Sequence, residues 1–212
     1  LREWGFRQPI KIGSTAVEDS VLAGQRDNAH TRRSSQDPFR ILFLARIVEA
    51  KGIYETLRTF SLVRRRYSQA MLTIAGDGEE RARAEEYVRK HALAGITFTG
   101  HVQGQDKSRV YTDAHCYLFP THSEGMPTTV LEAMAYGLPV VTRPVGGVRD
   151  FFEHGKMGML TDSLAPETLA EHVCALIEAP ERCRHVAEYN REFARRRFAA
   201  SDGTSAGTRG RQ

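Results

Sequence analysis

Cysteine is scarce in this sequence of 212 residues, which contains only Cys116, Cys174 and Cys183. The number is odd, and no two of these residues form a Cys-x-x-Cys pair. Both facts argue against a disulfide framework and against a zinc site built on paired cysteines. We expect three ordinary reduced thiols.

Long apolar runs are also missing. No stretch approaches the roughly 18 apolar residues of a membrane-spanning helix, and residues 1–4 lack the basic-then-apolar pattern of a signal peptide. With 41% hydrophobic and 26% charged residues, the composition is that of a soluble globular chain that can bury one main core. We therefore expect a cytoplasmic protein.

Basic residues are over-represented near the carboxyl-terminal end. From residue 181 onward there are eight arginines and four acidic residues, and this imbalance accounts for the whole net charge of +4. We interpret the arginines at 191–197 as a solvated helix face and expect no nucleic-acid partner; peripheral contact with the inner face of a membrane stays open as an alternative. Residues 199–212, rich in Gly, Ser, Thr and Arg, are predicted to form a disordered basic tail.

Between the two ends, strand-like and helix-like segments alternate. Residues 39–45 form a continuous apolar run, typical of a strand that is buried on both faces. Ile53, Leu57, Phe60 and Val63 then recur at helical spacing, and three arginines follow where the helix dipole favours cations. Similar patterns predict further strands at 70–75, 96–100, 116–119, 139–142 and 159–161, and helices at 52–67, 79–93, 106–114, 129–136, 166–178 and 180–198.

This alternation requires crossover connections and therefore predicts a parallel sheet with helices on both faces, a doubly wound α/β fold of the Rossmann-like type. We assign residues 38–198 to this domain. Residues 1–37 are polar and interrupted by Gly, Ser and Asn. A short strand is predicted at 9–12, and residues 21–37 are interpreted as a linker.

The most informative segment runs from Glu124 to Glu132, where a turn rich in glycine and threonine leads into a helix. A helix N-terminus offers unpaired N–H groups and partial positive charge to a phosphate, and carboxylates accept hydrogen bonds from hydroxyls. Arg46 and Lys51 follow a predicted strand and are placed to reach the same anion. In a doubly wound sheet these loops meet beyond the carboxyl ends of the strands, which predicts a site for a sugar joined to a phosphate.

Each feature taken alone has a second interpretation. The turn at 76–78 (Gly-Asp-Gly) is more often structural than ligand-binding. Thr129 and Glu132 fit a capping box at a helix start. Arg46 and Lys51 are also compatible with solvated surface charges beside Glu49. His122 is interpreted as a polar residue at the rim of the site.

Several motifs occur here in the same order as in the carboxyl-terminal, donor-binding domain of the GT4 family of retaining glycosyltransferases, which have the GT-B fold. The chain resembles that domain over about residues 38–180. The segments that carry the resemblance are Arg46 to Gly52, Ala75 to Gly78, Phe98 to Gly100, Glu124 to Val141, and Gly146-Gly147.

The resemblance implies a role for each matching residue. It implies that Arg46 and Lys51 bind the donor diphosphate, that Glu124 contacts hydroxyls of the transferred sugar, and that Glu132 binds the ribose. It further implies two stretches of backbone contact: Gly125, Met126, Pro127 and Thr128 along the sugar and diphosphate, and Gly100, His101 and Val102 near the base.

The implied reaction transfers a hexosyl group from a UDP-, GDP- or ADP-sugar to a glycan or lipid-linked acceptor, with retention of configuration, as in cell-surface polysaccharide synthesis. Negative charge grows on the β-phosphate as the glycosidic bond breaks, and pre-placed cations stabilise that state. The sequence contains no Asp-x-Asp motif. We therefore expect Arg46 and Lys51 to supply the positive charge, with no metal and no cofactor.

Members of the GT4 family have a second, amino-terminal domain that binds the acceptor. Residues 1–37 resemble the end of that domain and the connector, with Ser14-Thr15 where Asn-Gly is usual. We expect such a domain as a partner, in cis or in trans. A stand-alone module that binds a nucleotide sugar without transferring it is the alternative.

Overall fold

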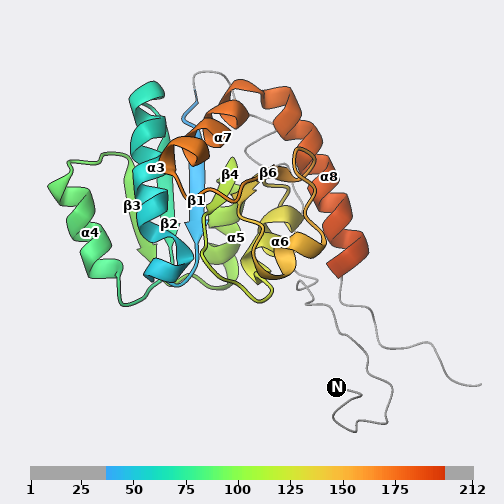
Figure 1. Cartoon of the computed structure of the whole chain (residues 1–212), viewed down its shortest axis with the longest axis horizontal. Coiled ribbons are helices and arrows are strands. Elements are labelled where there is room, and N and C mark those ends of the chain that lie inside the picture. Colours follow the sequence, from blue (N-terminus) through green and yellow to red (C-terminus); the bar gives the residue numbers. More distant parts are fainter. Residues whose placement is uncertain (1–36, 199–212) are drawn as a thin grey trace, which may run out of the picture.

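The computed structural model describes residues 37–198, which form a layered α/β arrangement (Figure 1). The strand predicted at 9–12, most of the predicted linker and the predicted tail at 199–212 lie outside the described residues. No helix among residues 37–198 is long and apolar enough to cross a membrane.

The predicted alternation of strands and helices is confirmed from the first buried strand to the last helix. The strands are β1 (Arg40–Leu44), β2 (Met71–Ala75), β3 (Ile96–Gly100), β4 (Cys116–Phe119), β5 (Val140–Thr142) and β6 (Gly158–Leu160). The helices are α3 (Ile53–Arg66), α4 (Arg81–Lys90), α5 (Gly104–Thr112), α6 (Thr128–Ala135), α7 (Pro166–Glu178) and α8 (Pro180–Phe198). Two short 3₁₀ helices, η2 (Glu49–Lys51) and η3 (Gly146–Asp150), were not predicted.

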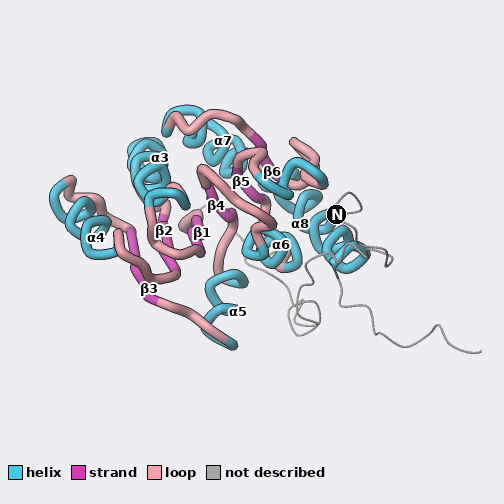
Figure 2. The backbone as a smooth tube through the Cα atoms, turned by 60° about the horizontal axis from the view of Figure 1, so that its bottom comes forward, coloured by secondary structure: helices cyan, strands magenta, loops and turns pink. Residues whose placement is uncertain are grey.

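The six strands form one sheet in the order β3-β2-β1-β4-β5-β6, and every neighbouring pair is parallel. Helices α3 and α7 pack together on one face of the sheet, while α5 and α6 lie on the other (Figure 2). The predicted doubly wound, Rossmann-like fold is therefore confirmed.

The two central strands are buried on both faces, as the apolar run in β1 predicts. Ile41, Leu42 and Phe43 are at most 1% exposed, and all four residues of β4 are buried. The rings of Phe43 and Phe119 pack with centroids 6.2 Å apart. Since burial of each such side chain contributes about 1.5–3 kcal/mol, β1 and β4 form the rigid centre from which the site loops extend.

A close contact fixes the start of α3 against the end of β4. Gly52, the residue before α3, has a φ of +80°, and a Cβ atom there would lie 2.3 Å from the carbonyl oxygen of Pro120. Only glycine fits, both for its left-handed backbone and for its lack of a side chain. This contact brings Lys51 next to the loop that follows β4.

Candidate functional site

The candidate site lies at the edge of the sheet where the strands have their carboxyl ends. The loops that follow β1, β2, β3 and β4 all begin at this edge, and β1 and β4 are neighbours in the sheet. The chain leaves β1 for α3 on one face, and it leaves β4 for α6 on the other (Figure 2). Such a switch between crossover directions opens a crevice in which doubly wound proteins bind ligands.

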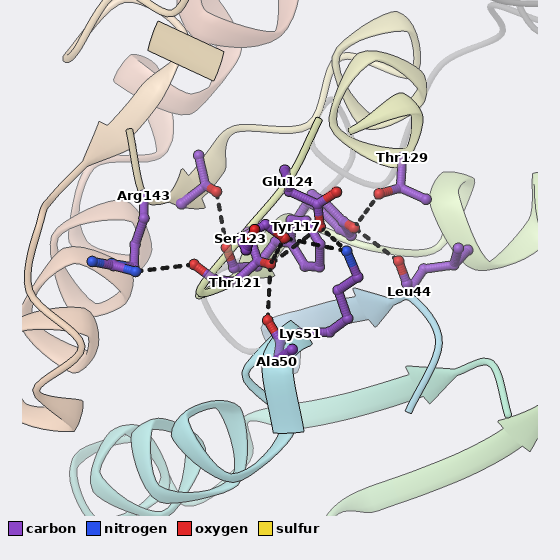
Figure 3. Close-up of polar contacts among 11 residues, drawn as sticks. Leu44, Ala50, Lys51, Tyr117, Thr121, Ser123, Glu124, Thr129 and Arg143 are labelled. Atoms are coloured by element: carbon purple, nitrogen blue, oxygen red, sulfur yellow. Dashed lines mark hydrogen bonds and ion pairs between the residues drawn. The ribbon is translucent and has the colours of Figure 1, made fainter. Parts of the chain in front are cut away.

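Lys51 and Glu124, which are 73 positions apart in the sequence, form an ion pair in this crevice (Figure 3). The Lys51 Nζ atom lies 2.5 Å from Glu124 Oε1 and 3.4 Å from the Ser123 carbonyl oxygen. The same carboxylate oxygen accepts a hydrogen bond of 3.1 Å from the Thr121 hydroxyl. The side chains are 22% and 11% exposed, so both groups are positioned by the fold while remaining open to a ligand.

The loop that carries Glu124 is fastened from two directions. Its Thr121 hydroxyl and His122 N–H lie 3.1 and 2.9 Å from the Ala50 carbonyl oxygen, and Arg143 donates to the Thr121 carbonyl oxygen at 3.2 Å (Figure 3). The His122 ring is 40% exposed and lies 3.6 Å from Glu55, on α3. These contacts place His122 beside the site, as the sequence suggested, without bringing it to the Lys51–Glu124 pair.

Glycines of the neighbouring turns are explained by close backbone packing. A Cβ atom at Gly146 would lie 2.1 Å from the Glu124 carbonyl oxygen, and the Gly147 N–H donates to the Gly125 carbonyl oxygen at 2.6 Å. Gly76 and Gly78 approach the backbone of residues 45–47 in the same manner. Their contacts support the structural interpretation of the turn at 76–78.

Gly125 is different, because no contact within residues 37–198 accounts for it. A Cβ atom added at Gly125 would meet no atom of these residues within 4 Å, and its φ lies outside the left-handed region. Glycine at such a position is typical of a backbone that a ligand approaches closely. Met126, next to it, is 36% exposed, and residues 127–128 lead directly into α6.

Glu132 does not cap α6, so the capping-box alternative is wrong. The helix begins at Thr128 with Pro127 as its N-cap, and no side chain caps it. The carboxylate instead turns to α5, where it accepts hydrogen bonds from Lys107 Nζ at 2.6 Å and from the Tyr111 hydroxyl at 2.9 Å. The uncapped start of α6 leaves N–H groups free for an anion.

Thr129, the other half of the predicted box, lies 2.8 Å from the hydroxyl of Tyr117, which is also 2.8 Å from the Leu44 carbonyl oxygen (Figure 3). Burial raises the pKa of Tyr117, so this phenol stays protonated and ties β1 to the start of α6.

A hollow of about 670 Å³ adjoins Glu132. This volume suits a small-molecule ligand. It includes His101, Val102 and Glu132, which the sequence predicted for nucleotide binding, and Gly100, at the end of β3, directly precedes His101 in the chain. The lining residues are His101, Val102, Gln103, Gly104, Gln105, Lys107, Ser108, Tyr111, Glu132 and Tyr136.

Arg46 lines a different hollow from Glu132. It is exposed and lines a second hollow of about 770 Å³, together with Ala50, His122 and Glu80 among others. Neither this hollow nor that of Glu132 is lined by Lys51 or Glu124. The structure therefore joins Lys51 to Glu124 but does not bring Arg46 into the same contact.

The sequence reasoning missed Lys107 and Tyr111. They are four residues apart on α5 and so share one face of that helix, which was the available signal. Burial is the largest cause that raises the pKa of Tyr111 well above its usual range, so its hydroxyl stays a donor to Glu132. Among residues 37–198 no cluster of His, Cys, Asp and Glu has the arrangement of a metal site.

A family model described as "Glycosyl transferases group 1" matches residues 25–193. The chain belongs to this family. The chain is 29% identical over 164 residues to the glycogen synthase of Mycobacterium tuberculosis. This alignment covers 75% of this chain and 39% of the relative. It is 26% identical over 166 residues to the capsular polysaccharide biosynthesis glycosyltransferase CapM of Staphylococcus aureus, covering 77% of this chain and 43% of CapM.

A solved structure agrees on the fold of this chain. The Anabaena protein HepE, crystallised in complex with UDP and glucose, superposes with a TM-score of 0.71 at 19% identity, over 85% of this chain and 48% of HepE. The GT-B resemblance is therefore confirmed at the level of fold. The chain spans less than half of each of these three proteins.

Proposed function

We propose that this chain is the donor-binding half of a retaining glycosyltransferase. It would take a hexosyl group from a UDP-, GDP- or ADP-sugar to a glycan or lipid-linked acceptor in cell-surface polysaccharide synthesis. Membership of the group 1 family and the similarity to CapM support the class of reaction. The observation that carries the donor site is Gly125, which leaves open space between an ion pair and an uncapped helix start.

The proposed donor lies along the crevice with each part next to a matching group. Its diphosphate faces Lys51 and the N–H groups at the start of α6, since both are positive and accessible. The sugar hydroxyls face Glu124, the ribose faces Glu132, and the base enters the hollow at residues 100–102. Backbone at residues 125–128 passes close to the sugar and diphosphate.

The Lys51–Glu124 pair offers the donor one positive and one negative partner. The two groups lie 2.5 Å apart. The incoming diphosphate offers Lys51 a second anion, and the carboxylate then accepts hydrogen bonds from the sugar hydroxyls. As the glycosidic bond breaks, negative charge grows on the β-phosphate, and Lys51 and the helix start stabilise it. Arg46 is proposed as a second, more peripheral cation.

Lysine, arginine and the helix start would supply the positive charge, so the proposed reaction needs no divalent metal. The acceptor is proposed to bind an amino-terminal domain, in cis or in trans. Cytoplasmic location and peripheral contact with the membrane's inner face belong to the same proposal, since lipid-linked acceptors lie there.

Calorimetric titration with UDP-, GDP- and ADP-glucose tests the donor site. We expect the protein to bind at least one of them, and Lys51→Ala to weaken binding by about 10–100-fold, because a hydrogen bond to a charged group contributes about 1.5–3 kcal/mol. Lys156→Ala removes a comparable lysine–glutamate pair outside the crevice and serves as the control. Failure of all three to bind, or equal affinity of the two variants, would refute the proposed site.

Transfer separates the two functions that fit a donor-binding domain. If the chain is half of a transferase, mixing it with an amino-terminal acceptor-binding domain should yield a glycosylated acceptor from the donor that binds. A donor that binds but is never transferred, with any such partner, would identify a nucleotide-sugar-binding module instead.

A further inference from the structure

The carboxylate of Glu132 is held on both of its oxygens by side chains of α5. Lys107 Nζ lies 2.6 Å from Oε1, and the Tyr111 hydroxyl lies 2.9 Å from Oε2 and 3.3 Å from the Thr129 carbonyl oxygen. The Glu132 side chain is 16% exposed and that of Lys107 is 34% exposed. Both residues line the 670 Å³ hollow, so the pair is part of its wall.

The wall behind this pair is rigid. Tyr111 is fully buried and stacks on Tyr136, at the carboxyl-terminal end of α6, with ring centroids 5.0 Å apart and an interplanar angle of 11°. The Tyr136 hydroxyl donates to the Ser108 hydroxyl at 2.8 Å. These contacts lock the face of α5 that carries Lys107 onto α6, so the position of the Lys107 ammonium is set by the packing of two helices.

The remaining hydrogen-bonding capacity of Glu132 points to a particular ligand group. An ionised carboxylate offers about four lone-pair sites, two on each oxygen. Lys107 and Tyr111 occupy one on each oxygen, which leaves one on each for a ligand. Two adjacent hydroxyls, such as those of a ribose, match that pair of acceptors.

The charge of Glu132 also requires a partner, because a carboxylate that is mostly removed from water is costly unless it is paired. Lys107 is the one lysine or arginine among the residues of the 37–198 range that line the hollow. Tyr111 donates a hydrogen bond but carries no charge. Loss of Lys107 would therefore leave the carboxylate tied at one oxygen and without a counter-charge.

We propose that Lys107 is a positioning residue for ribose recognition: it holds the Glu132 carboxylate oriented so that both oxygens accept hydrogen bonds from the ribose 2′- and 3′-hydroxyls. This inference rests on the proposed donor site and extends it to a residue on α5. Its consequence is selectivity, because the arrangement favours ribonucleotide donors over their deoxyribonucleotide counterparts.

Binding of UDP, GDP and ADP and of their 2′-deoxy forms to the wild type, Lys107→Gln, Lys107→Arg and Lys156→Gln tests this role. Loss of one hydrogen bond to a charged acceptor corresponds to about 10-fold or more, so the wild type should prefer the ribonucleotide by about that factor. Lys107→Gln should lower ribonucleotide affinity about 10-fold and 2′-deoxynucleotide affinity much less. Lys107→Arg should restore most of the preference, and Lys156→Gln should leave it unchanged.

A second arm asks whether Lys107 acts through Glu132. In a Glu132→Gln background, Lys107→Gln should cause no further loss, since the positioned carboxylate is already gone. Thermal unfolding of Lys107→Gln confirms that the variant is folded, and Lys107→Arg provides a second folded test.

Three outcomes would overturn the inference. Equal losses for ribose and deoxyribose ligands would mean that Lys107 contacts the phosphates or only supports the fold. Tighter binding by Lys107→Gln would mean that Lys107 blocks Glu132. A wild type that binds none of the three nucleotides would refute the proposed function and this role together, whereas either of the first two outcomes would refute this role alone.

Discussion

The same three residue types meet in two places with opposite surroundings. In the hollow, Glu132 contacts Lys107 at 2.6 Å and Tyr111 at 2.9 Å. On the outer surface, Glu153 accepts a hydrogen bond from Lys156 at 2.7 Å and another from the Tyr189 hydroxyl at 2.6 Å. The contacts are nearly identical in length, so geometry alone does not distinguish a site from a surface ion pair.

Burial separates the two clusters. Lys156 and Glu153 are 63% and 44% exposed, against 34% and 16% for Lys107 and Glu132. At the surface, hydrogen bonds are the main cause of the lowered pKa of Glu153, first the one from Lys156 and then the one from Tyr189. In the hollow, burial is the main cause of the raised pKa of Tyr111. Water competes with the contacts of the first cluster, whereas the second cluster is better shielded from water.

The largest difference between the clusters should appear in nucleotide affinity. Glu132→Gln removes the charge but keeps the shape, and we expect it to weaken binding of the preferred nucleotide sugar by about 10–100-fold, because charged hydrogen bonds contribute about 1.5–3 kcal/mol. Glu153→Gln should leave affinity unchanged within about twofold, since surface changes away from a site have little effect. Titration calorimetry on both variants measures this contrast. Equal affinities of the two variants would show that the clusters do not differ in nucleotide binding.

The tyrosines should differ in stability. Tyr111→Phe removes a buried hydroxyl and leaves the Glu132 carboxylate with one donor fewer, which should lower the free energy of unfolding by about 1–2 kcal/mol. Tyr189, which is 37% exposed, should tolerate the same change within about 0.5 kcal/mol. Urea unfolding of the two variants provides the measurement. A Tyr189→Phe variant as unstable as Tyr111→Phe would show that burial does not decide the outcome.

The smallest effect concerns pH. The pKa of Glu153 is lowered in the folded protein, so its contribution to stability is present above the ordinary value of 4.5 and is lost as the pH falls below it. Lys156 has a raised pKa, so its contribution is present below 10.5 and is lost as the pH rises further. Thermal unfolding of Glu153→Gln should show a slightly flatter decline below pH 4.5 than the wild type. If the loss of stability below pH 4.5 were the same in the variant and the wild type, the Glu153–Lys156 pair would make no net contribution to stability in water.

Much of the fold was predictable because it depends on local patterns. The continuous apolar run at 39–45 predicted a strand buried on both faces, and the structure confirms it. Alternating strands and helices then fixed a parallel sheet, which gathers the loops after the strands at one edge. For this reason the proximity of Lys51 to Glu124 followed from sequence, although 73 positions separate them.

The unpredicted parts depend on contacts between elements. Glu132 was compatible with capping its own helix, and only the packing of α5 on α6 shows that its carboxylate turns to Lys107 and Tyr111. The course of the chain between Arg46 and Lys51 follows a three-residue 3₁₀ turn, which is too short to have a hydrophobic period. The separation of Arg46 from the ion pair could not be read from residue order.

The pairing of β1 with β4 also has a consequence for how the molecule assembles. Ile41 aligns with Cys116. The strand that precedes Glu124 therefore pairs with a strand that lies far earlier in the chain. Closing so large a loop costs chain entropy, and parallel pairings between remote segments form slowly. The local unit from β1 to β2 can form first, while the crevice comes into being only when β4 docks beside β1. Ligand binding would therefore report the docking of β4, and refolding followed by nucleotide affinity should lag behind refolding followed by helix content.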